Sequence, residues 1–449
     1  MVRHRLPSSS YYTPVGESEW SRETLCERPI AVLPGAYRNP IEMARHVAEH
    51  VRTPQPFFVM DVAAVQRRLD ALRIVCPRLN ASFSVALNAD PVLARIIANN
   101  EASFEVSNTE EMQMASLHVE PSRITLLSNM LTRKSIRSAA DADVGTIVVE
   151  SEKQLQDVMK YAPRAEILIA INLRSTEVPF GVNLEDVNGL IEIGELIGVN
   201  VVGVHIDMGP QAGNEDYSVA LQTAADIFEA AQERRVEMHR VSLGDLVFAG
   251  NAMTEEFIRF ASGLNRMIND VFPIGVQVSA NVGRFIVTNA FTLCTTVIGK
   301  QTIGGEDGVG FVYQTNDGVY GSFGCRQMNI DPSCQPLHPS TLDEPEHFGT
   351  VVGPTLDQLD IAQKQIRFRQ LRVGDWLVWE KMGAFTIPVD SDYTAPPVYY
   401  YSAKECWKKL SVKEERRRSP TPDEDLGSDC DGYASSSESE SEGLVDNLF

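Results

Sequence analysis

Eight short apolar runs alternate with amphipathic helical patterns through the middle of this chain. Helical periodicity lies between the runs, for example in VLARIIANN (92–100) and SEKQLQDVMKYA (151–162). Eight strand–helix alternations over about 230 residues, close to the length typical of the fold, predict an α/β fold with a parallel (β/α)8 TIM barrel. In such a barrel, functional groups lie at the carboxyl ends of the strands. The predicted strands are SFSVAL (82–87), SFEV (103–106), ITLL (124–127), TIVV (146–149), EILIAI (166–171), VVGVHI (201–206), HRVSL (239–243) and GVQVSA (275–280).

Beyond Phe291 the sequence is rich in β-forming runs, such as GVGFVYQTNDGVYGSF and LRVGDWLVWEKMGAFTI, and shows little helical periodicity. Turn residues separate these runs, so we expect an antiparallel β domain, built as a barrel or a sandwich. Near the N-terminus, IEMARHVAEHV is typical of a helix and ERPIAVLP of a strand that joins the β domain. The expected parts are an N-terminal segment of helix and strand (1–54), the TIM barrel (55–290), the β domain (291–412) and a basic-then-acidic disordered tail (413–449).

The C-terminal residues concentrate acidic side chains. The net charge of the chain is −21, and residues 419–449 hold nine Asp or Glu and no Lys or Arg. Many serines and few apolar residues accompany them, so this part should be disordered. A basic block, KKLSVKEERRR (408–418), precedes the acidic residues and could pair with them. Ser435, Ser437 and Ser439 each lie three residues before a glutamate, which favours a phosphorylation switch; a solubilising tail is the alternative.

The composition argues against several classes of protein. There is no run of about 18 apolar residues, so we expect no transmembrane helix, and the N-terminus lacks the apolar core of a secretory signal. Seven scattered cysteines without CxxC spacing indicate reduced thiols, and they argue against a disulfide framework or a metal site. The negative charge disfavours nucleic acid and anionic membranes and favours a basic partner. We expect a location in the cytoplasm, or in the nucleus.

Several segments, in the same order, resemble the eukaryotic ornithine decarboxylase family of fold III pyridoxal-phosphate decarboxylases. The resemblance covers about residues 30–405 and implies a barrel followed by a β domain. The segments that carry it are PFFVMDVAAVQRRL (56–69), GRFIVTNAFTL (283–293), NDGVYGSFGC (316–325), VGPTLDQLD (352–360) and VGDWLVWEKMGAFT (373–386).

The same resemblance shows what this chain lacks. In active family members a lysine on the first barrel strand, in a V-K-x-N setting, forms an imine with the cofactor, and here Ala86 stands in that place. Alanine has no amine, so covalent anchoring is impossible. The family's carboxylate beside the pyridine nitrogen corresponds to Asn281, which is neutral and cannot keep the ring nitrogen protonated as a carboxylate does.

Other positions that hold the cofactor in the family also carry different residues. Phe385 replaces a phosphate-binding tyrosine and therefore has no hydroxyl group. Asp207 and Pro210 correspond to a stacking histidine and a serine, and Ala170 to an arginine on the fifth strand.

The loop that cradles the cofactor phosphate is altered as well. In the family, three glycines let backbone amides approach the phosphate, whereas here LGDLVFAG (243–250) places a carboxylate, Asp245, in that region. Only Arg284 and Glu105, which is an aspartate in the family, keep related chemistry. The resemblance therefore implies that pyridoxal-phosphate binding is lost, and we expect no cofactor and no metal.

The substrate side of the family's site is changed too. Asn329 falls where the family grips the diamine end with an aspartate, and Leu356 falls where it has its catalytic cysteine. Asp357 is kept, although a single carboxylate can equally be a turn or ion-pair residue. With the imine, ring, phosphate and acid positions all changed, we expect a pseudoenzyme without catalytic residues.

A fold kept without its chemistry suggests a binding role. Antizyme inhibitors are inactive members of this family that sequester antizyme, and the element that contacts antizyme corresponds here to about residues 133–156. It carries Arg133, Lys134 and Arg137 at a helix start and Leu155 in an S-E-x-x-L pattern. Basic side chains there could meet acidic groups of a partner; the alternative is a solvated helix face.

Two other functions remain open on the sequence. One is a divergent pyridoxal-phosphate-dependent ornithine or amino-acid decarboxylase, and the other is a noncatalytic scaffold or small-molecule sensor. Pro179 replaces an interface lysine of the family's dimer. With no shared active site to keep, we expect a monomer or a weak homodimer.

Overall fold

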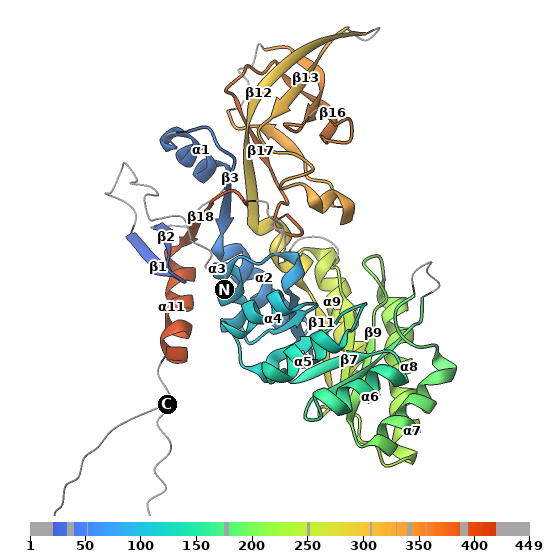
Figure 1. Cartoon of the computed structure of the whole chain (residues 1–449). Coiled ribbons are helices and arrows are strands. Elements are labelled where there is room, and N and C mark those ends of the chain that lie inside the picture. The colour runs from blue at the N-terminus through green and yellow to red at the C-terminus, as the bar shows by residue number, and fades with distance from the viewer. Residues whose placement is uncertain are drawn as a thin grey trace, which may run out of the picture.

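The computed structural model describes residues 21–33, 40–51, 53–174, 179–248, 252–305, 308–328, 330–338, 344–355, 357–386 and 394–418. Eight parallel strands close into a barrel in chain order, which confirms the predicted TIM barrel (Figure 1). The last strand pairs with the first, so the barrel has no free edge. The strands are β4 (Leu79–Ser84), β5 (Ser103–Val106), β6 (Ile124–Leu126), β7 (Thr146–Val149), β8 (Glu166–Ile171), β9 (Asn200–Ile206), β10 (Arg240–Asp245) and β11 (Gln277–Asn281).

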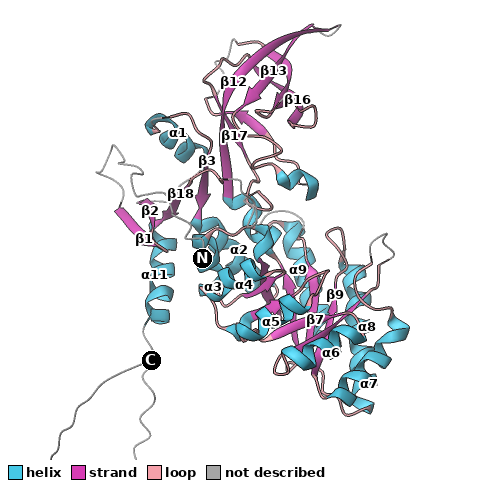
Figure 2. Ribbon diagram, viewed as in Figure 1, coloured by secondary structure: helices cyan, strands magenta, loops and turns pink. Residues whose placement is uncertain are grey.

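Helices surround the barrel strands (Figure 2). Polar residues at the strand ends cap several of them: Asp90 accepts a hydrogen bond from the Leu93 amide at 2.9 Å, and Ser151 caps the helix that follows it. Such caps satisfy amides that a helix start leaves without a partner. Among the described residues, none of the helices is long and apolar enough to cross a membrane. The helices are α2 (Val62–Val75), α3 (Pro91–Asn99), α4 (Thr109–Ser116), α5 (Arg133–Asp141), α6 (Glu152–Tyr161), α7 (Val187–Ile197), α8 (Asn214–Glu233), α9 (Glu255–Val271) and α10 (Gly283–Val287).

Strand alternation divides the barrel core into two layers. On β8, Ile167 and Ile169 pack in the cluster shared with the surrounding helices. Leu168 and Ala170 point the other way, into a separate apolar cluster with Val202 of the next strand. Successive residues of one strand therefore serve either the helix layer or the barrel interior.

The first barrel strand is shorter than predicted. It ends at Ser84, and Val85–Leu87 form a 3₁₀ turn, so Ala86 lies just past the strand and is exposed. Pairing with β5 stops at Ser84 opposite Glu105. Beyond that point the Asn88 amide donates to the Val85 carbonyl, and this local bond closes the turn.

The second domain is built on a ten-stranded sheet. Most of its pairs are antiparallel, as expected, but β18 pairs in parallel with β2 and β3, and β13 with β15. The sheet is therefore mixed, because it joins strands from opposite ends of the chain. Its strands are β1 (Ser21–Leu25), β2 (Arg28–Leu33), β3 (Phe57–Asp61), β12 (Phe291–Gly305), β13 (Gly308–Thr315), β14 (Cys334–Pro336), β15 (Glu346–Val352), β16 (Ile361–Arg369), β17 (Trp376–Trp379) and β18 (Val398–Ala403).

The N-terminal segment completes this sheet. The expected strand near residue 30 is β2, and the expected helix is α1 (Pro40–His50), which packs Val47 against Phe57 and Tyr401. The segment that was expected to begin the barrel, β3, instead pairs with β12 and β18. The boundary between the domains therefore follows Asp61, not residue 55.

The chain continues as a helix beyond the predicted end of the β domain. Helix α11 spans Lys404–Arg418, so residues 413–418, which were assigned to a disordered tail, are helical. The reason is packing: Leu410 is buried, and Glu414 accepts a hydrogen bond from Asn99 of α3 at 2.9 Å. The disorder expected for 419–449 lies outside the described residues.

Candidate functional site

The carboxyl ends of the barrel strands bring together several of the predicted positions. Glu105 comes from β5, Asp207 follows β9, and Asp245 and Asn281 end β10 and β11, where they pair in register. Arg284 begins α10 directly after them. We call this region the barrel mouth; it carries three carboxylates and one guanidinium from these elements.

Arg284 is engaged by protein groups on both sides. Its Nε lies 2.9 Å from Asp245 Oδ2, and its guanidinium lies over the Phe385 ring at 5.1 Å from the ring centroid. Nη1 also donates to the Met328 carbonyl at 3.3 Å. Burial raises the pKa of Asp245, and the adjacent guanidinium opposes that rise. The guanidinium of Arg284 is therefore paired with a carboxylate of the same chain.

Glu105 is buried at the mouth and accepts a hydrogen bond from Ser82 Oγ at 2.5 Å. Burial raises its pKa to about 7, and the nearby carboxylates Asp245 and Asp207 add to the rise. The mouth therefore holds a carboxyl group that changes charge near neutral pH.

Asp207 lies at the rim, with Oδ2 3.5 Å from Arg174 Nη1, and its Oδ1 accepts from the Gly209 amide at 2.9 Å. Gly244 passes close beneath it with φ +62°, and a Cβ there would lie 2.7 Å from the Asp207 Cβ. One glycine of the altered phosphate loop is thus required by close packing and by a left-handed backbone.

The side chain of Asn281 accepts hydrogen bonds from backbone amides. Its Oδ1 accepts from the Gly283 amide at 3.0 Å and from the Ser84 amide at 3.3 Å, which ties β11 to β4. The neighbouring Phe385 amide donates to the Leu87 carbonyl at 2.7 Å, so the turn that carries Ala86 is fixed to the β domain.

Other predicted positions make no hydrogen bond or ion pair with this cluster among the described residues. Ala170 is fully buried in the barrel wall, and Pro210 is exposed. Asp357 accepts a hydrogen bond from Tyr320 Oη at 2.6 Å and another from the Leu359 amide at 2.8 Å, in keeping with a turn residue. Asn329 and Leu356 lie outside the described residues.

Sequence reasoning missed a histidine inside the barrel. His205 of β9 is buried, and its Nδ1 shares a hydrogen bond of 2.9 Å with Ser242 Oγ. Burial lowers its pKa to about 4, so the imidazole is neutral at physiological pH. Strand alternation could have found it, because residues 203 and 205 share the face that points away from Val204.

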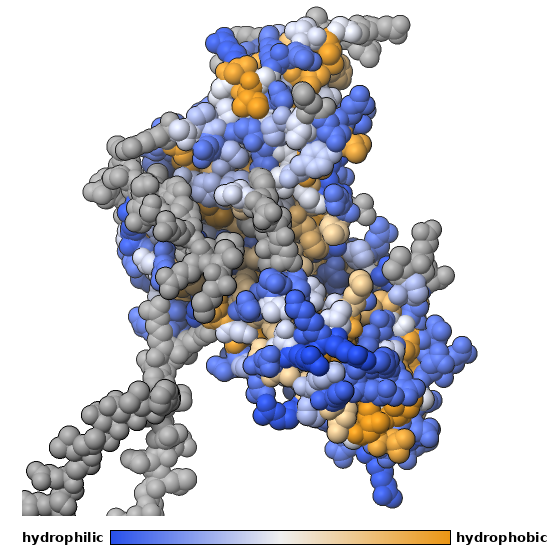
Figure 3. Space-filling model, in the orientation of Figure 1, coloured by the Kyte–Doolittle hydropathy of each residue, from blue (hydrophilic) through white to orange (hydrophobic). Residues whose placement is uncertain are grey.

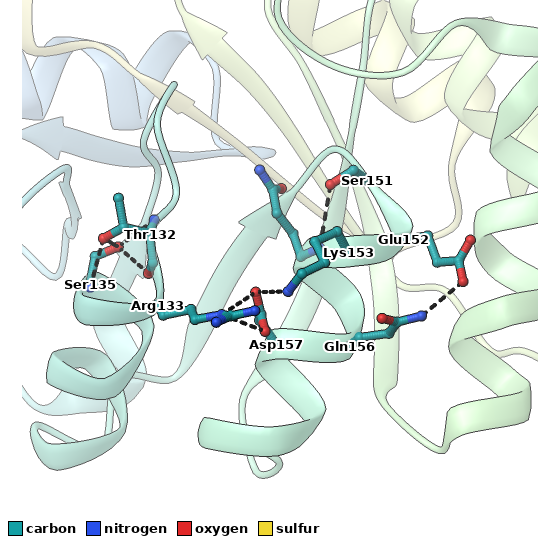
Figure 4. Close-up of polar contacts among 9 residues, drawn as sticks. Thr132, Arg133, Ser135, Ser151, Glu152, Lys153, Gln156 and Asp157 are labelled. Carbon is teal, nitrogen blue, oxygen red and sulfur yellow. Dashed lines mark hydrogen bonds and ion pairs between the residues drawn. The ribbon is translucent and has the colours of Figure 1, made fainter.

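The second predicted site is the surface of α5 and α6 (Figure 4). Arg133 Nε lies 3.2 Å from Asp157 Oδ1, and Lys153 pairs with the same carboxylate. Lys134 and Arg137 are exposed, and the Arg137 guanidinium stacks over the Tyr161 ring at 4.3 Å. Figure 3 shows that the surface over α5 and α6 is strongly hydrophilic.

Leu155 does not belong to this surface. It is fully buried in the core between α6 and the barrel, as is Val158 one turn later. The expectation that Leu155 contacts a partner is therefore wrong for the folded chain, because its helix face is directed inward.

Comparison with known proteins places the chain among amino-acid decarboxylases and their relatives. Residues 62–288, just over half of the chain, match the model of the pyridoxal-dependent decarboxylase, pyridoxal binding domain. Antizyme inhibitor 2 of Xenopus laevis is 29% identical over 383 residues, which are 79% of this chain and 83% of that protein. Ornithine decarboxylase of Mus musculus is 27% identical over 381 residues, 79% of this chain and 82% of that protein.

Solved structures agree with the fold. The arginine decarboxylase of Paramecium bursaria Chlorella virus superposes with a TM-score of 0.75 at 23% identity, covering 80% of this chain and 100% of that one. The lysine/ornithine decarboxylase of Vibrio vulnificus gives 0.72 at 21% identity, covering 81% and 98%.

The residues at the barrel mouth do not fit the cofactor of this family. Pyridoxal phosphate needs an amine for its aldehyde, a carboxylate for its ring nitrogen, and cations or free amides for its phosphate. The corresponding positions hold Ala86 and Asn281, and Arg284 is already paired with Asp245. Asp207 is likewise paired with Arg174, and Glu105 becomes negative as the pH rises through its pKa of about 7, so neither group favours a phosphate dianion.

The family match thus extends over the whole barrel, residues 62–288. The chain belongs to the pyridoxal-dependent decarboxylase family, as a member of the ornithine decarboxylase group that resembles the antizyme inhibitors.

Proposed function

We propose that this protein is a noncatalytic regulator that binds an antizyme-like protein and so acts on polyamine biosynthesis. The observation that carries the proposal is the barrel mouth, where the imine position is Ala86 and Arg284 is paired with Asp245 at 2.9 Å. The fold of the family is kept around a mouth that has lost the groups for its chemistry. Resemblance to antizyme inhibitors supports this role, whereas equally similar ornithine decarboxylases support only the family.

Under this proposal pyridoxal phosphate does not bind. Without a lysine at position 86 the aldehyde has no covalent anchor. A phosphate at the mouth would have to displace Asp245 from Arg284, and it would approach Glu105 and Asp207 as well. The free energy of displacing one carboxylate by another anion beside two more acids is unfavourable.

The proposed contact surface is the exposed start of α5. Arg133 already pairs with Asp157, so its positive charge is partly neutralised within the chain. Lys134 has no ion pair among the described residues, and Arg137 holds its charge above an aromatic ring. A basic edge on an otherwise acidic chain would select a partner with acidic groups.

The loss of cofactor chemistry is tested by adding pyridoxal phosphate to the purified protein, with an ornithine decarboxylase as positive control. We expect no saturable imine absorbance band at one equivalent of cofactor, and no borohydride-trapped adduct that maps to the barrel mouth, because exposed lysines elsewhere give only nonspecific adducts. We also expect no CO₂ release from ornithine, arginine or lysine. A saturable imine band or turnover would favour the alternative, a divergent decarboxylase.

The binding role is tested by capture of purified antizyme and by rescue of ornithine decarboxylase from antizyme. K134E/R137E should weaken capture about tenfold, or about 1.4 kcal/mol, since charge on a partner is then met by like charge. R259E/R266E on the exposed face of α9 makes the same change in charge elsewhere and should not weaken it.

The outcomes separate the remaining functions. Capture without rescue, or no capture at all, would favour a scaffold or a small-molecule sensor. Equal loss of capture in both double variants would indicate a general charge effect and contradict the α5 surface. Sedimentation should show a monomer or a weak dimer, and a tight homodimer at micromolar concentration would count against a surface free for another protein.

A further inference from the structure

A basic groove runs between α2 and the C-terminal helix α11, far from the barrel mouth. Its volume is about 690 Å³. Helix α2 contributes Arg73 and Ile74, and α11 contributes Lys408, Lys409, Val412 and Lys413. Figure 1 shows α11 lying at the side of the barrel at the end of the described chain. Neither the family chemistry nor the proposed partner surface uses this groove.

The charge of the groove is largely unneutralised. Asp70, its lining carboxylate, is already shared: it lies 3.7 Å from Arg73 Nη1 and accepts from Gln66 Nε2 at 2.9 Å. Lys408 and Lys409 are exposed, and neither forms an ion pair within the described residues. Burial lowers the pKa of Lys413, Arg73 and Lys409 lower it further, and Asp70 and Glu101 oppose that fall; its ammonium group donates to Asn100 Oδ1 at 2.6 Å.

The groove also has an aliphatic component. Ile74 is 71% exposed and Val412 is 48% exposed, so each presents a methyl-bearing side chain to solvent between the cations. An occupant that combines closely spaced carboxylates with an aliphatic side chain would neutralise the lysines and cover this apolar surface.

This chain itself carries such a segment. The sequence DEDLGSDCD, residues 423–431, has five carboxylates and a leucine. We propose that residues 423–431 dock in the α2/α11 groove of their own chain, with Asp423, Glu424 and Asp425 against the lysines and Leu426 against Ile74 and Val412.

The tether makes the intramolecular contact geometrically feasible. Helix α11 ends at Arg418, so the groove lysines lie five to ten residues back along it, roughly 8–15 Å at 1.5 Å per residue. Residues 419–423 can span roughly 17 Å when extended. Pro420 and Pro422 lack the amide hydrogens needed to prolong the helix, so the chain can leave the helix axis directly after it. A short tether holds a segment near millimolar local concentration.

The test is acylation of lysines by a soluble active ester, with the rate at each lysine read by mass spectrometry. The full chain is compared with a chain ending at Arg418 and with the full-length variant D423N/E424Q/D425N. Lys408 and Lys409 should react about threefold more slowly in the full chain. This rate is expected if the tethered segment, at about millimolar local concentration, occupies the groove about two-thirds of the time and only the open form reacts. The truncated and neutralised chains should both lose this protection, and so should the full chain in 1 M salt, where the Debye length is about 3 Å.

Lys153 and Lys381, which lie elsewhere on the molecule, serve as reference lysines and should react alike in all three chains. Equal rates at Lys408 and Lys409 in the full and truncated chains would overturn the proposal and leave the groove open to another acidic partner. Protection that grows with protein concentration would also overturn it, because a second copy would then be the occupant. Protection that persists in D423N/E424Q/D425N would show that these carboxylates are not the contact.

Discussion

Replacing Glu105 by glutamine should remove a pH-dependent loss of stability from the barrel. The carboxyl group is buried at the mouth, 2.5 Å from Ser82 Oγ, with Asp207 and Asp245 near enough to raise its pKa further. Glutamine keeps the shape and the acceptor oxygen for Ser82 but cannot ionise.

The sign and size follow from linkage between protonation and folding. The pKa of Glu105 rises from 4.5 to about 7 in the folded protein, so the folded state holds its proton more tightly than the unfolded state. The stabilisation is complete below pH 4.5 and is lost as the pH rises through 7. This difference in pKa between the folded and unfolded states corresponds to about 3 kcal/mol of folding free energy, since each pKa unit is worth about 1.4 kcal/mol. The E105Q variant should therefore match the wild type near pH 4.5 and exceed its stability by up to about 3 kcal/mol above pH 8.

The assay is urea unfolding between pH 5 and pH 8.5, followed by two signals. The tryptophans among the described residues, Trp376 and Trp379 of β17 and Trp407 of α11, lie outside the barrel, so their fluorescence reports the other parts of the chain. Far-UV circular dichroism reports the helices around the barrel. The pH-dependent difference between wild type and E105Q should appear in the dichroism transition.

E229Q is the matched control, because Glu229 is exposed in the middle of α8 and the exchange of acid for amide is the same. Its stability should run parallel to that of the wild type at every pH. If E105Q also runs parallel to the wild type from pH 5 to 8.5, Glu105 is not a neutral-pH titrating group and the account of the mouth is wrong.

Three further changes test other parts of the structure. A86K alone should give no saturable imine band with pyridoxal phosphate, and trapping at position 86 no stronger than at other exposed lysines, because Arg284 remains paired with Asp245; a saturable band or preferential trapping at position 86 would refute that block. Y400F removes the 2.6 Å hydrogen bond to buried Asp90 that joins the β domain to α3, and it should cost about 1.5–3 kcal/mol in urea unfolding, with no change contradicting this role. L155A should cost about 2–5 kcal/mol of stability, as expected for a buried leucine. K134E should leave the unfolding midpoint unchanged, because Lys134 is exposed. An L155A variant that is as stable as the wild type but fails to capture antizyme would restore Leu155 as a contact.

Periodicity was sufficient for the architecture. Each of the eight predicted runs became a barrel strand, because a strand buried on both faces leaves an apolar signature in the sequence. The N-terminal strand and helix were also foreseeable from local pattern. The placement of β3 could not be predicted, because its partners β12 and β18 lie more than 200 residues away in the sequence. An apolar run indicates a strand but does not indicate which strands pair with it.

The sequence was sufficient to predict which catalytic and cofactor-binding residues are replaced, but not how the remaining side chains are arranged in space. Ala86 and Asn281 could be read directly by comparison with the family, whereas the Arg284–Asp245 pair depends on two strand ends meeting in space. Leu155 shows the opposite error. Its spacing to Val158 is that of an inward helix face, and this local signal was outweighed by a motif resemblance.

The position of β18 has a consequence for synthesis on the ribosome. This strand, Val398–Ala403, inserts between β2 and β3, which are made about 370 and 340 residues earlier. The barrel strands are complete once residue 281 has emerged, but β2 and β3 each keep one unpaired edge until β18 leaves the exit tunnel. Exposed edges of this kind invite pairing with other chains. A premature stop between about residue 290 and residue 398 should therefore yield an intact barrel attached to an aggregation-prone sheet, so that translation to the end of β18 decides whether the protein stays in solution.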